Sequence, residues 1–303
     1  MKILVTGASG LLGAEFCTQL MASHKHEVWA VDNHSRSSIV PHCDQWICMD
    51  LTDQNDIRSL PTDFERIYHY AAINGTRNFY ERPNHVLRTN TMIDLNVFDL
   101  ARRCTGLDLL IYASSSEVVS GDAQSPVPEN ADICVENIHN PRWSYRLPKV
   151  LSENYLANCS DFNWLILRYF NVYGSQSKDG HFVADQMRKI RQGRFEIIGA
   201  TETRSFCHVS DAVEASLVVS DRTSHEVVNI GNDREISVLE AANVMAQAMG
   251  HSDPQWIQTN SLSGSTPQRR PDISRLHKIF PAYQPRTFEQ GIQHIVDSQK
   301  ELS

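Results

Sequence analysis

The 303-residue sequence contains no CxxC pair and no long apolar run. Its seven cysteines are scattered and odd in number, which is not the pattern of a disulfide framework or of a zinc site. No segment approaches the roughly 18 apolar residues that a membrane-spanning helix needs. The N-terminus enters a glycine loop directly and carries no signal-peptide pattern. We therefore expect a cytoplasmic protein with reduced thiols, no metal ion and no membrane partner.

Positive charge is also scarce. The 28 lysines and arginines are outnumbered by 36 aspartates and glutamates, which gives a net charge of −8. General nucleic-acid binders and anionic-membrane binders need a basic surface, so the charge balance argues against both classes. A local basic pocket for a phosphorylated small molecule is still compatible with this balance.

Short apolar runs alternate with longer amphipathic segments over the first two-thirds of the chain. This alternation is typical of βαβ units and predicts a doubly wound parallel sheet of the Rossmann type. The expected strands are Lys2–Thr6, Glu27–Asp32, Gln45–Met49, Arg66–Tyr70, Asp108–Ala113 and Asn163–Arg168. The expected helices are Leu12–Ser23, Val86–Cys104 and Tyr145–Cys159.

The pattern loosens after Asn171. Further helices are expected at Phe182–Gln192, from Ser210 onward and at Ser237–Met249, and a strand at Val227–Ile230 is expected to return to the main sheet. The predicted division therefore places residues 1–171, with a returning segment at about 207–234, in a large nucleotide-binding domain. Residues 172–206 and 235–303 are expected to form a smaller α/β lobe at the carboxyl edge of the sheet, where such folds bind substrates.

A glycine-rich segment, TGASGLLG, joins the first expected strand to the first expected helix. Gly7, Gly10 and Gly13 permit a sharp turn, a close approach of the backbone to phosphate and tight packing of helix on strand. The helix N-terminus that follows favours negative charge. This loop, with Leu11 and Leu12, is predicted to bind the pyrophosphate of a dinucleotide.

An acidic residue, Asp32, ends the second expected strand nineteen positions after the last of these glycines. Its carboxylate can accept hydrogen bonds from ribose hydroxyls and repels a 2′-phosphate, so Asp32 and the adjacent Asn33 favour NAD over NADP. Arg36 would weaken this preference, and Asp32 could alternatively cap a turn. Asp50 and Leu51 are expected near the adenine, although Asp50 could equally be the N-cap of a helix.

Two further segments add chemistry to the nucleotide-binding fold. Ser114–Glu117 follows the fifth expected strand, and Tyr145 and Lys149 are four residues apart, so they share a helix face. A free phenol has a pKa near 10 and is a poor base, but a neighbouring ammonium favours the phenolate. Removal of an alcohol proton with hydride transfer to NAD⁺ is the expected reaction. The alternative is that Tyr145 is a packing residue and Lys149 a solvated one.

Pro148 lies inside this motif and would normally interrupt a helix. We expect the helix to start at about Tyr145. Pro148 would then lie among the first residues, whose N–H groups have no partner within the helix, and would cost little.

Together these motifs resemble the extended short-chain dehydrogenase/reductase family, in particular its NAD-dependent nucleotide-sugar epimerases, dehydratases and decarboxylases. The resemblance covers nearly the whole chain. Besides the glycine loop and the Tyr–Lys pair, it rests on Tyr68–Ala72, Asn90, Arg168–Gly174, Arg204–Asp211, Asn229–Gly231 and Arg269–Asp272.

The resemblance implies a role for several residues. Ser115 would be the catalytic serine beside Tyr145 and Lys149. Asn90 would hold the active-site backbone near the cofactor, and Asn171 would contact the sugar diphosphate. The remaining implied contacts are Ala71 and Ala72 with the cofactor, Ser116 with the substrate, and Arg204 and Arg269 with the phosphates, a task suited to guanidinium groups.

The step that follows C4 oxidation stays open. Glu117 is typical of several dehydratases and of UDP-glucuronate decarboxylases, and it could abstract the acidic C5 proton of a 4-keto sugar or be a solvated loop carboxylate. Ser116 stands where many 4,6-dehydratases have an aspartate, although guanosine-type dehydratases also use Ser-Glu. The segment Asn140–Tyr145 resembles that of bacterial UDP-glucuronate decarboxylases, whereas Val119–Gly121 departs from the usual V-Y-G.

We therefore expect an NAD-dependent epimerase/dehydratase, an isomerase or lyase acting on a nucleoside-diphosphate sugar. A UDP-glucuronate decarboxylase-type enzyme is the alternative. A non-catalytic NAD-binding regulator would be expected to lack Tyr145 or Lys149, and a sterol or flavonoid reductase would carry a basic residue in place of Asp32. The resemblance also implies a homodimer. A helical stripe that could form its interface, or equally belong to the core, is made of Leu87, Thr91, Leu95 and Phe98.

Overall fold

The computed structural model describes residues 1–35, 37, 39–119, 124–135, 137–177, 180–261 and 265–300. Its central sheet has seven parallel strands in the order β11–β6–β5–β4–β1–β2–β3. These strands are β1 (Lys2–Thr6), β2 (Glu27–Asp32), β3 (Gln45–Cys48), β4 (Arg66–His69), β5 (Leu109–Ser115), β6 (Trp164–Tyr169) and β11 (Glu226–Ile230). The predicted doubly wound parallel fold is confirmed. Arg36, Ser120, Gly121 and part of the loop after Thr259 lie outside the described residues.

The apolar runs that predicted the strands become buried strands. Every residue of β4 and β6 is buried, because helices cover both faces of the sheet. The strand order reverses beside β1, which pairs with β2 on one side and with β4 on the other. At such a reversal the loops at the carboxyl ends of the strands separate and leave a crevice for a ligand.

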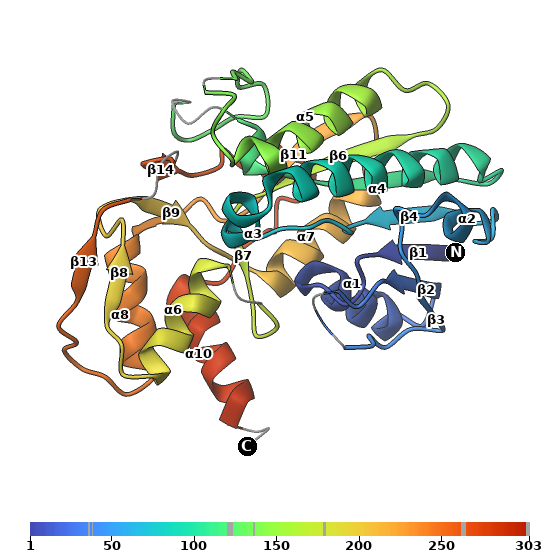
Figure 1. The fold of residues 1–303 in the computed structure, drawn as a ribbon. Coiled ribbons are helices and arrows are strands. Elements are labelled where there is room, and N and C mark those ends of the chain that lie inside the picture. The colour runs from blue at the N-terminus through green and yellow to red at the C-terminus, as the bar shows by residue number, and fades with distance from the viewer. Residues whose placement is uncertain are drawn as a thin grey trace.

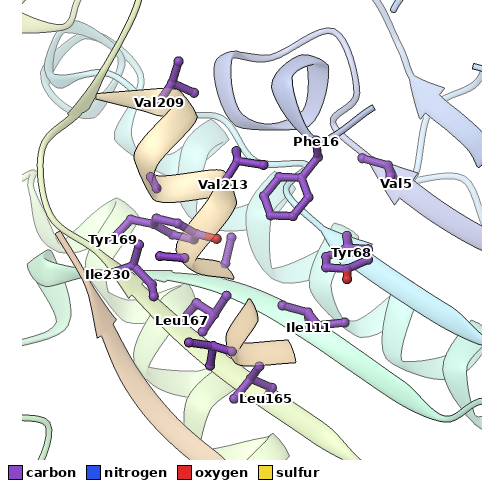
Figure 2. Close-up of a cluster of buried hydrophobic side chains, with 14 of the residues drawn as sticks. Val5, Phe16, Tyr68, Ile111, Leu165, Leu167, Tyr169, Val209, Val213 and Ile230 are labelled. Carbon is purple, nitrogen blue, oxygen red and sulfur yellow. The ribbon is translucent and has the colours of Figure 1, made fainter. Parts of the chain in front are cut away.

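Helices α1 (Leu11–Ala22) and α7 (Val209–Ser220) cover one face of the sheet. Figure 2 shows Phe16 of α1 and Val213 of α7 directed toward the strand residues Tyr68 and Leu167. The other face is covered by three helices, α2 (Gln54–Arg58), α4 (Pro83–Arg103) and α5 (Trp143–Ala157). None of the helices in the described part of the chain has both the length and the apolar character of a membrane span.

Strand β11 returns to the main sheet from beyond the first part of the smaller lobe. It pairs in parallel with β6 at the edge of the sheet, with Val228 opposite Leu167. The sequence predicted this return, and the pairing confirms it.

The smaller lobe lies to one side of the sheet and carries its own apolar cluster (Figure 1). Its helices are α6 (Phe182–Arg191), α8 (Val238–Ala248) and α10 (Phe288–Lys300). Its strands are β8 (Glu196–Ile198), β9 (Thr203–Ser205), β12 (Glu235–Ser237), β13 (Ile257–Thr259) and β14 (Gln268–Arg269). The separate cluster supports the predicted division of the chain, which stays a prediction.

Several short elements were not predicted. They are α2, α3 (Thr76–Glu81), α9 (Ser274–Ile279), β7 (Val172–Tyr173), β10 (Cys207–His208) and the strands of the smaller lobe. Helix α10 was also missed, although Phe288, Ile292 and Ile295 carry a helical spacing and are all buried. The fifth strand runs to Ser115, two residues beyond its predicted end.

The explanation offered for Pro148 is wrong. Helix α5 begins at Trp143, so Pro148 is its sixth residue and lies in the helix interior. The Tyr145 N–H already donates to the Arg142 carbonyl at 3.2 Å. Because proline has no N–H, the carbonyl of Ser144 loses the helical hydrogen bond that residue 148 would otherwise donate.

Candidate active site

A cavity of about 690 Å³ lies at the carboxyl ends of the strands and is lined by residues of both the sheet domain and the smaller lobe. All but one of the predicted site residues line it. Those from the predicted cofactor site are Gly7, Gly10, Leu11, Leu12, Gly13, Asp32, Asn33, Asp50, Leu51, Ala71 and Ala72. Those from the predicted catalytic and substrate sites are Ser115, Ser116, Glu117, Tyr145, Lys149, Asn171, Arg204 and Arg269.

The glycine loop leaves no room for side chains at two of its positions. Gly7 has a φ of +68°, and a Cβ there would lie 2.5 Å from the backbone nitrogen of Ala71. A Cβ at Gly13 would lie 2.3 Å from the carbonyl oxygen of Gly7. Gly10 is the N-cap of α1. Leu11 and Leu12, at the start of α1, line the cavity, and the first N–H groups of a helix have no partner within it. This arrangement fits the pyrophosphate of a dinucleotide.

Asp32 is oriented by two backbone groups. Its carboxylate accepts the Ser9 N–H at 3.1 Å and the His34 N–H at 2.8 Å. Each oxygen of a carboxylate has a further lone pair, so both can still accept a ribose hydroxyl. The predicted NAD contact and the alternative turn-capping role are thus compatible in the same side chain.

Asp50 is not a helix N-cap. Its carboxylate accepts the backbone N–H and the hydroxyl of Thr52, both at 2.9 Å. The N-cap of α2 is Asp53, whose side chain accepts the Asn55 N–H. The alternative interpretation of Asp50 is therefore wrong, and the residue remains at the cavity wall beside Leu51.

Asn90 is the one predicted residue that does not line the cavity. It is fully buried on α4, where its amide accepts the Ile73 N–H at 2.7 Å and donates to the Ile73 carbonyl at 3.0 Å. Asn90 therefore acts on the backbone that forms the wall of the cavity, rather than facing a ligand itself.

The serines that end β5 differ in their surroundings. Ser114 is buried and donates to Glu153 Oε1 at 2.5 Å. Ser115 caps the following turn by accepting the Glu117 N–H at 3.2 Å. The hydroxyl of Ser115 can still donate into the cavity, which is what the predicted catalytic role requires.

Tyr145 and Lys149 are both buried at the cavity wall. The Tyr145 ring stacks on Phe79 with a centroid distance of 4.8 Å. Lys149 is only 3% exposed, so the alternative of a solvated lysine is wrong. Burial lowers the pKa of Lys149, and the negative charges of Asp94 and Glu153 partly offset this effect.

Glu117 is held by two guanidinium groups. Its Oε1 accepts from Arg142 at 2.7 Å and from Arg269 at 2.5 Å. Burial alone would raise the pKa of Glu117, but the charges of Arg269 and Arg142 outweigh it and hold the pKa at about 2. The alternative of a solvated loop carboxylate is therefore wrong. As the residue stands, it is ionised and a weak proton acceptor.

Two arginines from distant parts of the sequence lie side by side in the smaller lobe. Arg204 on β9 is opposite Arg269 on β14 in a parallel pair. Arg204 donates to Glu202 at 2.7 Å, and burial lowers the pKa of Arg204. Asn171 lies near them with a φ of +40° and donates to the Ser205 carbonyl at 2.9 Å. Paired guanidinium groups at a cavity wall suit a diphosphate.

Some residues of the site were missed at the level of sequence. Arg142 lies in the segment whose resemblance to decarboxylases was noted, but its pairing with Glu117 had no local signal. Phe79 belongs to the unpredicted helix α3. Asp94 was detectable, because a charged residue one turn after Asn90 interrupts an apolar helix face.

Comparison with known proteins agrees with this geometry. Residues 3–231 match the model of the NAD dependent epimerase/dehydratase family. The chain belongs to this family. It is therefore an NAD-dependent enzyme, as the resemblance implied.

Individual relatives extend the match to the whole chain. The chain is 28% identical to the UDP-N-acetyl-alpha-D-glucosaminuronate decarboxylase of Bacillus cytotoxicus, over 99% of this chain and 98% of that protein. It has the fold of UDP-glucose 4-epimerase from Thermotoga maritima, with a TM-score of 0.88, 22% identity and full coverage of both chains. A second similar structure is the UDP-glucuronic acid 4-epimerase of Bacillus cereus in complex with UDP-glucuronic acid and NAD. It matches with a TM-score of 0.86, 24% sequence identity and full coverage of both chains.

Proposed function

We propose that the protein binds NAD at one end of the cavity and a nucleoside-diphosphate sugar at the other. In this proposal it epimerises or dehydrates the sugar through transient oxidation of C4 to a ketone. The observation that carries the proposal is that one cavity joins the glycine loop, the Tyr145–Lys149 pair and the Arg204–Arg269 pair. An open α/β sheet binds its ligands at this edge.

Each side chain at the centre of the cavity has a task in this reaction. When bound, NAD supplies an acceptor for the hydride that leaves C4. Tyr145, held against Phe79, takes the proton of the C4 hydroxyl, and the nearby ammonium of Lys149 favours the phenolate that does so. Ser115 donates a hydrogen bond to the same substrate oxygen.

The diphosphate would bind at the smaller lobe. Arg204 and Arg269 present two neighbouring guanidinium groups there, and Asn171 adds an amide. Arg269 is engaged by Glu117 before substrate arrives, so the phosphates would take over part of that contact.

The ionised state of Glu117 bears on the second step. Dehydration requires removal of the C5 proton. In the protein without substrate, Arg142 and Arg269 hold the pKa of Glu117 at about 2, and such a carboxylate is poorly suited to accept that proton. Epimerisation at C4 only needs the 4-keto sugar to turn and take the hydride back on its other face. The two guanidinium groups on Glu117 therefore favour C4 epimerisation over dehydration.

Decarboxylation is the second candidate, and Arg142 favours it. This third guanidinium lies beside Glu117 at the cavity wall, where a substrate carboxylate could contact it. In a uronate oxidised at C4, the carboxyl group is β to the ketone. The bond from C5 to the carboxyl carbon can then break, releasing carbon dioxide and leaving its electrons in an enolate at C4. This step needs no C5 base, and a relative over the whole chain is named as a uronate decarboxylase.

Mass spectrometry separates these outcomes. The purified protein is incubated with UDP-glucuronate, UDP-glucose, UDP-N-acetylglucosamine and GDP-mannose. Loss of carbon dioxide identifies a decarboxylase and loss of water a dehydratase. An unchanged mass with an altered proton NMR coupling at C4 identifies an epimerase. If none of a broad panel of sugar nucleotides binds, the proposed substrate class is wrong.

A homodimer and a cytoplasmic location are also part of the proposal. Helices α4 and α5 pack together, and Leu87 and Leu151 on them are 37% and 44% exposed. The predicted stripe is divided, because Phe98 is fully buried in the core. Light scattering tests the dimer. The wild-type protein should have the mass of a dimer, and the double variant Leu87→Asp with Leu151→Asp should have the mass of a monomer. A wild-type protein with the mass of a monomer would contradict the proposal.

All seven cysteines are free, which supports a reducing compartment.

A further inference from the structure

An ionised acid is buried behind Lys149. Asp94 lies on α4, one turn after Asn90, and is fully buried. Its carboxylate accepts from Tyr112 at 2.6 Å, from Ser152 at 2.7 Å and from His69 Nε2 at 3.0 Å. Burial alone would raise the pKa of Asp94, but the charge of Lys149 and these hydrogen bonds hold it below its usual value.

The hydrogen bonds continue from Asp94 to the glycine loop. The Nδ1 atom of His69 is 2.7 Å from the hydroxyl of Thr6, which in turn accepts the Ala71 N–H at 3.3 Å. Burial lowers the pKa of His69, so its ring is neutral. With its proton on Nε2 facing Asp94, the ring accepts a hydrogen bond from the Thr6 hydroxyl on Nδ1. Each polar group in this series, from Asp94 through His69 and Thr6 to Ala71, then has a hydrogen-bond partner. Ala71 is the residue that packs against Gly7.

Asp94 is also the anion that offsets Lys149. The ammonium lies 4.4 Å from the centre of the Tyr112 ring, whose hydroxyl donates to Asp94. Glu153, the other acidic neighbour, is already neutralised by two hydrogen bonds from Arg168, at 2.9 and 2.6 Å. A buried cation needs a compensating charge, and Asp94 supplies it.

Within the described part of the chain, no hydrogen-bond acceptor engages the Lys149 ammonium. The ammonium can therefore still donate to a ligand in the cavity that Lys149 lines. Asp94 acts on this group through its charge and leaves its donors unused.

We propose that Asp94 is a positioning residue for the oxidation step. It keeps Lys149 charged behind Tyr145 and, through His69 and Thr6, fixes the backbone against which the cofactor loop packs. The inference rests on the proposed function in taking Tyr145 as the base. The titratable groups facing Asp94 are Lys149 from α5, His69 from β4 and Tyr112 from β5.

The direction of the effect follows from the protonation states. The reactive form has Tyr145 deprotonated and Lys149 protonated. Burial already lowers the pKa of Lys149, and removal of the Asp94 charge lowers it further. The ammonium then loses its proton at a lower pH, so activity should be lost earlier on the alkaline side.

The test compares Asp94→Asn with Ser152→Ala by measuring kcat against pH. Asp94→Asn keeps the shape and removes the charge, so its alkaline limb should move down by about one pH unit and its maximum should fall about tenfold. Ser152→Ala removes one hydrogen bond from Asp94 and keeps the charge, so its alkaline limb should match the wild type. Coincident limbs in Asp94→Asn and wild type, or equal shifts in both variants, would overturn the proposal.

A second measurement covers the case in which Asp94→Asn does not fold. Electrostatic coupling is reciprocal, so Lys149→Met must raise the pKa of Asp94. Carboxyl NMR of protein labelled with ¹³C-aspartate follows this titration, with the Asp94 signal identified by its shift in Ser152→Ala. An unchanged titration midpoint overturns the proposal. Because this experiment needs no substrate, its result stays separate from any failure of the proposed function.

Discussion

The two ends of the cavity are built from different materials. At the glycine loop the wall is bare backbone, and the space at Gly7 and Gly13 admits no side chain. At the opposite end the wall is a set of charged side chains from both the sheet domain and the smaller lobe, with Glu117 between Arg142 and Arg269. The cofactor end is therefore already shaped for its ligand, whereas the substrate end must exchange an internal ion pair for an external anion. Shape controls the first end and charge the second.

Tyr145 lies where the two ends meet, and its loss should have the largest effect. Tyr145→Phe keeps the stack on Phe79 and removes the proton acceptor, so kcat should fall by at least about 10³-fold. Sugar-nucleotide turnover by mass spectrometry measures this. Tyr155→Phe, on the same helix, is the control and should retain activity. Wild-type turnover in Tyr145→Phe would show that another group is the base.

At the glycine loop, a substitution should reduce stability and NAD binding through steric clashes. Gly7→Ala places a methyl group 2.5 Å from the Ala71 nitrogen at a φ of +68°, so unfolding stability should fall by about 4 kcal/mol and NAD binding should be lost. Gly106→Ala is the matched control, because nothing lies within 4 Å of its added Cβ. Urea unfolding and calorimetry with NAD measure both. Equal free energies of unfolding for the two variants would contradict the view that close backbone contacts at Gly7 define the cofactor end of the cavity.

The contribution of the Glu117 ion pairs to protein stability should instead depend on pH. Because the folded pKa of Glu117 is about 2, below its usual value of 4.5, its contribution is present above about pH 4.5 and is lost as the pH falls toward 2. This contribution amounts to at most roughly 3 kcal/mol. Urea unfolding between pH 3 and 7 should show a shallower loss in Glu117→Gln than in wild type. Parallel curves would mean that the ion pairs contribute little.

Asp32 lies at the cofactor end of the cavity but acts through its charge. It therefore tests whether shape alone determines which ligand that end binds. Asp32→Asn keeps an acceptor for the Ser9 and His34 N–H groups and removes the repulsion of a 2′-phosphate. The ratio of NADP to NAD affinity should rise about tenfold. Calorimetry with both dinucleotides measures it, and Asp53→Asn, at the N-cap of α2, serves as the control. An unchanged ratio would assign the discrimination to another group.

The smallest expected effect is a gain of affinity. Glu117→Gln removes the carboxylate that competes for Arg142 and Arg269, so UDP should bind about fivefold more tightly, or roughly 1 kcal/mol. Calorimetric titration with UDP measures this change. Glu240→Gln on the exposed face of α8 should leave the affinity as it is. Weaker binding in Glu117→Gln would mean that Glu117 organises the arginines for the phosphates instead of competing with them.

The same contrast explains how far the sequence could be interpreted. The sheet and the glycine loop were predictable, because buried parallel strands require apolar runs and a phosphate-binding turn requires glycines at fixed spacing. The returning strand β11 was predictable for the same reason. Short elements such as α3 and β14 carry too few residues to show a periodicity.

The charged contacts could not be predicted in the same way. Glu117 is 25 residues from Arg142 and 152 from Arg269, and no local pattern links them. The resemblance assigned Arg269 to phosphate without its contact to Glu117. Pro148 was misplaced because the helix start depends on the turn before it, where the Arg142 N–H donates to the Asn140 side chain.

The pairing of Arg204 with Arg269 has a consequence for the order in which the parts of the cavity wall are completed during synthesis. The glycine loop, β4 and the Tyr–Lys helix all leave the ribosome before the strand that carries Arg269. Arg269 is also the last residue along the sequence among the described residues that line the cavity, and every residue predicted to contact the dinucleotide precedes it. During synthesis, all residues predicted to contact the dinucleotide are therefore made before the Arg204–Arg269 pair that would bind a sugar nucleotide can form.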